Sequence, residues 1–278
     1  MLPVRQDGTA LNSSRSTARQ VSETTEKDSP PSPADPRPLR EALLAFAGSL
    51  AVTVVLYRLR FLPFVGENLH ALVGLAFLLI PITILQRRGE DFERFGIALG
   101  GLLGAEATGG LFAFPKDLAR ALWRGRRDLL REIAFSLAVM AVVVPPFIVG
   151  FRIYWRTANF DFRLTSEFVS IALAQFVVVA LPEEFFYRGY LQTRLGQVFP
   201  KRFRLLGAPY GLHVLLTSVL FGLGHFLVDL RPDRLAVFFP ALLFGWIREL
   251  RGGIGACVFV HALCNVAADT LMLGYGLG

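Results

Sequence analysis

Cysteine is scarce in this sequence: its 278 residues include only two, Cys257 and Cys264. They lie seven residues apart in one apolar block, about two helical turns from each other, which excludes a disulfide between them within one helix. Free cysteine behaves as a small hydrophobic side chain, so we interpret both as packing residues. The fold is therefore expected to form without disulfide bonds.

Nucleotide-binding motifs are absent as well. No GxGxxG sequence opens a helix after a predicted strand, and no GxxxxGK sequence occurs. Such motifs hold phosphate groups against a glycine-rich backbone and a helix N-terminus, so their absence leaves no indication of ATP or NAD. We expect the protein to act without a cofactor.

Long apolar runs dominate what is present. The chain is 53% hydrophobic, its mean hydropathy is +0.49, and it contains 25 phenylalanines. A run of about 20 apolar residues crosses a hydrocarbon core of about 30 Å. The sequence therefore predicts an all-α bundle of seven to eight transmembrane spans. The seven apolar segments are Ala42–Tyr57, Leu69–Leu85, Ile133–Phe151, Phe168–Phe186, Leu212–Leu227, Leu235–Ile247 and Ile254–Leu273.

Two other regions differ from these spans in composition. Residues 1–38 are rich in Ser, Thr, Pro and charged residues, which predicts a disordered cytoplasmic tail ahead of a transmembrane domain at 39–278. The stretch Gly96–Phe114 is apolar but rich in glycine, which disfavours a stable helix. We interpret it as an interfacial or re-entrant segment, with an eighth span as the alternative.

The basic residues are distributed unevenly along the predicted topology. A cytoplasmic N-terminus with seven spans places 22 Lys and Arg residues on the cytoplasmic side and seven on the other. Such a bias sets the orientation of membrane proteins, so it accounts for the net charge of +7 without a nucleic-acid partner. The seven residues on the other side are Arg58, Arg60, Arg152, Arg156, Arg163, Arg231 and Arg234.

Two adjacent acids, Glu183 and Glu184, occur at the end of the fourth apolar segment. Ionisable side chains at membrane depth are costly, so each invites a functional explanation. Arg188 follows Glu184 by four residues and can pair with it on one helical face. Glu183 points about 100° away, which leaves it available as a general base for water.

The fifth and seventh segments carry further polar residues. His225 lies between apolar neighbours, close to Gly222 and Gly224, which would let another backbone or a substrate approach closely. His261 and Asn265 are four residues apart and share a helical face. Two donors on one face could stabilise the oxyanion formed at an attacked carbonyl, although Asn265 could equally bridge helices.

At these residues the sequence resembles the CPBP family of membrane proteins, which includes the type II CAAX prenyl endopeptidases. That family is marked by the motifs EExxxR, FxxxH and HxxxN, in this order on separate helices. The three matches are Glu183-Glu184 to Arg188, Phe221 to His225, and His261 to Asn265. The resemblance covers about 90 residues of the C-terminal half.

The resemblance implies an eight-helix bundle with a catalytic cavity open to the cytoplasmic side. It also implies that Glu183 with His225 activates a water molecule, that His261 and Asn265 form the oxyanion hole, and that Glu184 with Arg188 holds the site. One depth estimate conflicts with this grouping. Counted from the cytoplasmic edge, Glu183 lies about 10 Å deep and His225 about 20 Å deep.

Three other interpretations of these residues are considered. One Glu and two His residues could hold zinc, although the HExxH motif is absent and Asn is a poor zinc ligand, which favours metal-free catalysis. A non-enzymatic immunity or partner-binding protein is a second alternative. A transporter is a third, but no internal repeat supports it.

The expected substrate is a membrane-anchored protein or peptide, cleaved near the membrane surface. The abundance of Arg, Ala, Leu and Gly suits a bacterial chain, so we expect a bacterial inner membrane as the location. The lipid bilayer is the other expected partner.

Overall fold

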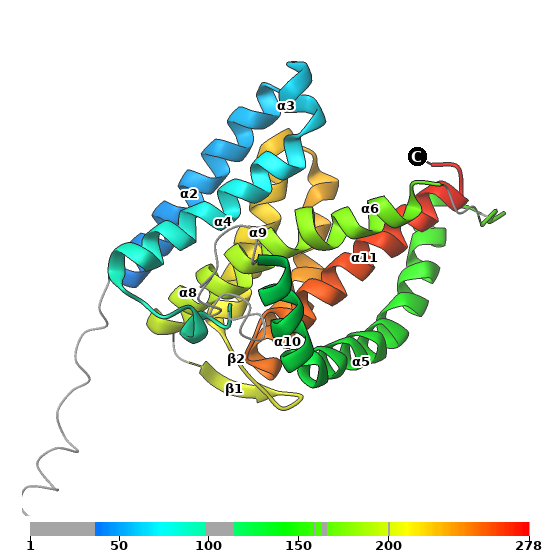
Figure 1. The fold of residues 1–278 in the computed structure, drawn as a ribbon. Coiled ribbons are helices and arrows are strands. Elements are labelled where there is room, and N and C mark those ends of the chain that lie inside the picture. Colours follow the sequence, from blue (N-terminus) through cyan, green and yellow to red (C-terminus); the bar gives the residue numbers. More distant parts are fainter. Residues whose placement is uncertain (1–36, 98–113, 158, 163–165, 200, 278) are drawn as a thin grey trace, which may run out of the picture. The chain divides into compact units, whose positions relative to one another are not determined.

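The computed structural model describes residues 37–97, 114–157, 159–162, 166–199 and 201–277. Within these residues the regular secondary structure is helical apart from one short antiparallel hairpin (Figure 1). The elements in chain order are α2 (Arg37–Arg58), α3 (Pro63–Glu67), α4 (Leu69–Arg88), η1 (Phe92–Phe95), α5 (Phe114–Trp155), α6 (Phe168–Ala174), η3 (Gln175–Ala180), α7 (Leu181–Glu184), η4 (Phe185–Leu191), α8 (Gln192–Val198), β1 (Lys201–Leu205), β2 (Ala208–Gly211), α9 (Leu212–Asp229), η5 (Pro232–Val237), α10 (Phe238–Arg251) and α11 (Gly255–Gly274).

Six of the described helices are long and apolar enough to cross a membrane. Many large apolar side chains on them face outward, including Val142, Ile153 and Val169, each more than half exposed. In water such surfaces would be unstable, whereas lipid covers them without cost. The protein is therefore an integral membrane protein. The six spans are α2, α4, Gly125–Trp155, Phe168–Val198, α9 and α11.

The span count is one lower than the number of apolar segments in the sequence. The segment Leu235–Ile247 is divided between the 3₁₀ helix η5 and α10, and α10 has only 14 residues, about 21 Å. The glycine-rich stretch Gly96–Phe114 lies almost wholly outside the described residues. The expected tail, 1–38, also lies outside them, except for the last two residues, which belong to α2.

The fourth span is longer than expected. Helices α6, η3, α7, η4 and α8 join into one helix from Phe168 to Val198, twelve residues beyond the predicted end at Phe186. The β1–β2 hairpin that follows was not predicted. Its strands contain polar and basic residues with little alternation, so they lack the usual strand pattern.

Ion pairs tie several helix ends together at one end of the bundle, which we call the Glu41 end. Glu41 at the start of α2 pairs with Arg88 at the end of α4 and, over 2.8 Å, with Arg194 of α8. Arg251 at the end of α10 likewise pairs with Glu132. The opposite ends of these helices form the other end of the bundle, which we call the Tyr57 end.

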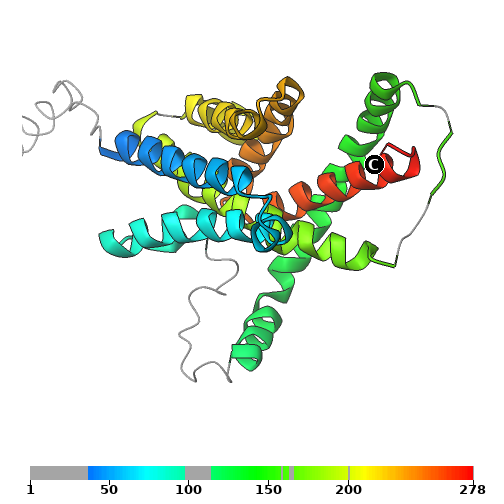
Figure 2. The same ribbon diagram turned by 90° about the horizontal axis from the view of Figure 1, so that it is seen from above.

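The helices pack in two neighbouring groups. Helix α2 packs beside α4 and α9, whereas α11 packs beside α5 and η3 (Figures 1 and 2). The long helix Phe168–Val198 contacts both groups, through η3 toward α11 and through η4 toward α2 and α9. Its buried aromatic residues Phe185, Phe186 and Tyr190 belong to the main hydrophobic core. The acidic pair of α7 therefore lies where the two groups meet.

Candidate active site

Glu183 and Glu184 lie on one α-helical turn between two π-helical segments. Segment η3 ends at Ala180 and η4 begins at Phe185. Pro182 has no backbone N–H, so regular α-helical hydrogen bonding is weakened at this point. π-Helical turns within α-helices are frequent at functional sites. The sequence thus places both acids where the backbone departs from regular α geometry.

The pair of Glu184 and Arg188 is completely buried. Arg188 Nη1 donates to Glu184 Oε1 over 3.0 Å, and Nη2 donates to the Ala241 carbonyl over 3.2 Å. The rings of Phe221 and Phe244 lie against the guanidinium, 4.5 and 5.1 Å from its carbon. A buried ion pair needs such additional partners to offset its desolvation. The pairing predicted from the four-residue spacing is confirmed.

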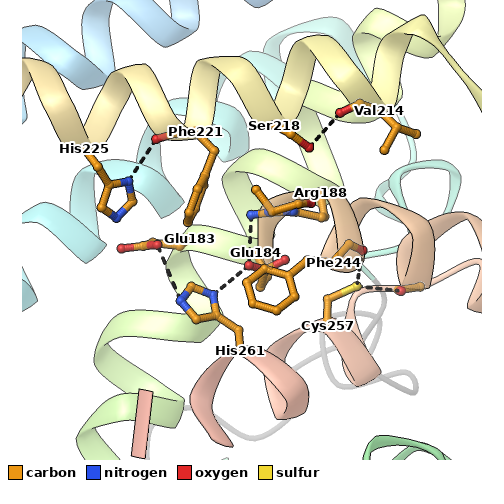
Figure 3. Close-up of polar contacts among 12 residues, drawn as sticks. Glu183, Glu184, Arg188, Val214, Ser218, Phe221, His225, Phe244, Cys257 and His261 are labelled. Carbon is orange, nitrogen blue, oxygen red and sulfur yellow. Dashed lines mark hydrogen bonds and ion pairs between the residues drawn. The ribbon is translucent and has the colours of Figure 1, made fainter. Parts of the chain in front are cut away.

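His261 joins the two acids. Its Nδ1 lies 2.7 Å from Glu184 Oε1, and its Nε2 lies 3.8 Å from Glu183 Oε2 (Figure 3). Because a carboxylate can only accept, Nδ1 carries a proton and donates to Glu184. The ring of Phe244 stacks on this imidazole, with centroids 4.9 Å apart. His261 is thereby fixed with Nε2 directed toward Glu183.

His225 is held by its own helix. Its Nδ1 lies 2.9 Å from the carbonyl oxygen of Phe221, one turn earlier in α9. A carbonyl only accepts, so Nδ1 donates and the neutral ring keeps Nε2 as an acceptor. Figure 3 shows the Glu183 carboxylate between His225 and His261. Phe221, which is expected to orient the site, contacts His225 through its carbonyl and through its ring, whose centroid lies 4.5 Å from that of the His225 ring.

Asn265 lies one turn after His261 on α11 and contacts a different partner. Its Nδ2 donates to Gln175 Oε1 over 2.9 Å, and Gln175 Nε2 donates to Asp269 Oδ2 over 2.9 Å. Among the described residues, no hydrogen bond joins Asn265 to the two acids. The structure thus brings Glu183, Glu184, His225 and His261 together and leaves Asn265 at the edge of the group.

A cavity of about 190 Å³ lies against this group. Glu183, Tyr187, Gly224 and His225 line it on the side of the acids. Glu183 Oε2 is buried and has no hydrogen-bond partner among the described residues. Partly or fully exposed residues line the cavity at the Tyr57 end of the bundle. These are Tyr57, Leu69, His70, Asp229 and Arg234.

The position of this cavity bears on two expectations. A cytoplasmic N-terminus and a cavity open to the cytoplasm were expected together. Helix α2 begins at the Glu41 end, whereas the exposed residues that line the cavity lie at the Tyr57 end. The two features lie at opposite ends of the bundle, so the cytoplasmic N-terminus and the cytoplasmic opening point to different orientations, and both stay predictions.

The expected conflict between the depths of Glu183 and His225 disappears in the structure. The fourth span runs on to Val198, so Glu183 lies 15 residues, or about 22 Å, from its Glu41 end. His225 lies 13 residues, or about 20 Å, from the start of α9 at Leu212. The two residues are level because the predicted end of the fourth span was too early.

Sequence reasoning missed three residues of the site. Tyr187 lines the cavity one turn after Glu183, and its ring meets the Phe221 ring edge-on at 4.8 Å. Phe244 stacks on His261, and Gln175 binds Asn265. Tyr187 follows Glu183 by four residues, and this spacing could have placed both on one helical face from the sequence alone. Nothing in the sequence distinguishes Phe244 from the other phenylalanines.

No three His, Cys, Asp or Glu side chains in the described part of the chain are arranged to hold a metal ion. The zinc alternative therefore lacks a ligand set in these residues.

Fold and site together define an integral membrane protein with a buried cluster of two acids and two histidines beside a cavity. Residues 165–267 match the family model described as type II CAAX prenyl endopeptidase Rce1-like. This segment is therefore an Rce1-like domain of the CPBP family, and it contains every site residue predicted from the sequence. No curated protein and no solved structure matches the chain.

Proposed function

We propose that the protein is an intramembrane endopeptidase that hydrolyses a peptide bond near the membrane surface in a membrane-anchored protein. The observation that carries this proposal is Glu183, a carboxylate at a cavity wall with Oε2 buried and unbonded in the described structure. Buried polar atoms normally have a partner, and a water molecule supplies the missing donor. The family of residues 165–267 supports peptidase chemistry.

Glu183 is the general base in this proposal. It takes a proton from the water while the water oxygen bonds to the scissile carbonyl carbon. The resulting carboxylic acid gives that proton to the peptide nitrogen as the C–N bond breaks, so one water is consumed for each bond. His225 accepts the second water hydrogen at Nε2, which directs the oxygen toward the carbonyl.

The oxyanion is stabilised by His261 and Asn265. When doubly protonated, His261 donates from Nδ1 to Glu184 and presents Nε2–H on the side of Glu183. The Asn265 amide has two hydrogens, of which Gln175 takes one and the other is available to the oxyanion. Donors fixed before the reaction stabilise charge at little reorganisation cost.

Glu184 and Arg188 are positioning residues. Glu184 Oε1 accepts from both Arg188 and His261, so it fixes the imidazole while neutralising the buried guanidinium. Neither side chain is exposed, so neither is expected to contact the substrate.

Cells carrying the wild-type chain and cells carrying Glu183→Ala provide the test. The membrane proteins of both strains are compared by mass spectrometry of their terminal peptides. The expected result is a small set of membrane-anchored proteins that stay uncut only with Glu183→Ala. Identical termini and an unchanged phenotype would instead support the partner-binding alternative. We propose a bacterial inner membrane with the N-terminus in the cytoplasm as the location.

A further inference from the structure

We propose that the cavity is entered from the extracytoplasmic face, and that its occupant is an extended segment flanking the span of a membrane-anchored protein on that face. The sidedness follows from the fold and the charge distribution alone. The identity of the occupant as a substrate rests on the proposed function.

The first step is the position of the cavity along the helices. On α2 its lining begins at Leu50 and reaches Tyr57, close to the end of the helix at Arg58. On α4 it covers the first half, from Leu69 to Phe77. All residues that line the cavity outside the long helix therefore lie in the half of the bundle nearer the Tyr57 end.

The second step is the short distance from His225 to that end. His225 is four residues before the end of α9 at Asp229, about 6 Å along the axis. Arg234 of the following η5 also lines the cavity, and it pairs with Asp229 over 3.3 Å. The reacting groups are therefore close to one surface of the membrane and about 20 Å from the other.

The third step is which face of the membrane this surface is. The segments next to the helix ends at the Glu41 end hold 21 of the 29 Lys and Arg residues, and those at the Tyr57 end hold seven. The remaining one, Arg188, is buried in the site. Basic loops remain in the cytoplasm during insertion. The Tyr57 end, and the cavity with it, therefore faces away from the cytoplasm.

The size of the cavity limits what enters it. A volume of about 190 Å³ is below the roughly 300 Å³ of common small-molecule sites and equals about six water molecules. It accommodates a side chain or two beside the attacking water. An extended peptide segment meets this limit, because it presents its side chains one at a time, whereas a folded domain does not.

Residues that line the cavity but lie outside the family segment 165–267 contribute to the choice of substrate. Residues from α2 and α4, including Thr53, Tyr57 and His70, line the cavity but precede residue 165, where the family match begins. The catalytic groups come from residues 165–267, whereas half of the wall comes from the N-terminal spans. Substitutions at Thr53 are therefore expected to change which segment is cut without removing the catalytic groups.

Sidedness is tested by thiol labelling of two variants at opposite ends of α4, His70→Cys and Arg87→Cys. Both positions are exposed. A membrane-impermeant maleimide is applied to intact cells and to opened cells. The wild-type chain is the control, because it shows how much of the labelling comes from the native Cys257 and Cys264. The expected result is labelling of His70→Cys in intact cells and of Arg87→Cys only in opened cells. The reverse pattern would overturn the proposed sidedness.

The occupant is tested by mapping the cleavage sites of proteins that stay uncut with Glu183→Ala. The expected sites lie on the extracytoplasmic flank of each span. Sites on the cytoplasmic flank would overturn this inference while leaving the peptidase proposal intact. If no protein stays uncut with Glu183→Ala, both the peptidase proposal and the proposed substrate fail. The labelling result still decides which face of the membrane the cavity lies at.

Discussion

His261 and Glu184, 77 residues apart in the sequence, are joined by a 2.7 Å contact from Nδ1 to Oε1. The same oxygen accepts from Arg188, so one atom connects the fourth and last spans and neutralises a buried charge.

Removing the charge of Glu184 should destabilise the fold and abolish activity. In Glu184→Gln the Arg188 guanidinium stays fully buried without its anion, which costs about 3–5 kcal/mol in comparable cases. Thermal unfolding in detergent measures the loss. The exposed Glu67→Gln serves as a control and should unfold like the wild type.

A double variant separates stability from chemistry. Glu184→Gln combined with Arg188→Met removes both charges, so most of the lost stability should return. Activity should stay low because His261 no longer donates to a carboxylate. A double variant as unstable as Glu184→Gln would show that the pair is not the source of the effect.

Replacing Glu183 should abolish hydrolysis but preserve the fold. Glu183→Gln retains the shape of the side chain but cannot take a proton, and loss of a general base costs about 10²–10⁴-fold in kcat. Cleavage in isolated membranes measures the rate, and unfolding in detergent checks the fold. A rate within tenfold of the wild type would contradict the assignment of Glu183 as the base.

Asn265→Ala distinguishes an oxyanion donor from a helix bridge. Loss of one such donor lowers kcat by about 10²–10³-fold with little change in KM. Gln175→Leu, which removes the partner of Asn265 but leaves its amide in place, should have a smaller effect. Equal, small losses in both variants would indicate that Asn265 only links α11 to η3.

Gly224 and Gly222 both lie on α9 but differ in the space around them, so one is a control for the other. A methyl group at Gly224 would lie 2.7 Å from Tyr187 Oη, whereas one at Gly222 meets its nearest atom at an ordinary 3.5 Å. Gly224→Ala should therefore lose about 1–3 kcal/mol of stability and narrow the cavity. Gly222→Ala should be neutral or slightly stabilising, because alanine favours helix. Thermal unfolding and cleavage assays on both variants measure this contrast.

Chelators should leave the activity unchanged. The described residues offer no set of three ligands for a metal ion, and the proposed base is a carboxylate. Cleavage is measured in membranes after prolonged treatment with EDTA or phenanthroline, with a zinc protease in the same membranes as the positive control. Loss of activity that zinc restores would establish the metal alternative.

The sequence by itself determined the features that depend on neighbouring residues. Span length predicted membrane residence, and the spacing of Glu184 and Arg188 predicted their pairing, because each needs only one helix. The three motifs predicted the family of residues 165–267 in the same way. The roles of His225, His261 and Asn265 in catalysis stay predictions.

Tertiary structure decided the features that depend on distant helices. The continuation of the fourth span to Val198 brought Glu183 level with His225, and packing of α11 on η3 turned Asn265 toward Gln175. The exposed lining of the cavity at the Tyr57 end comes from α2, α4, α9 and η5, which lie far apart in sequence. Helical periodicity fixes which residues share a face, but packing alone fixes which faces meet and where a cavity opens.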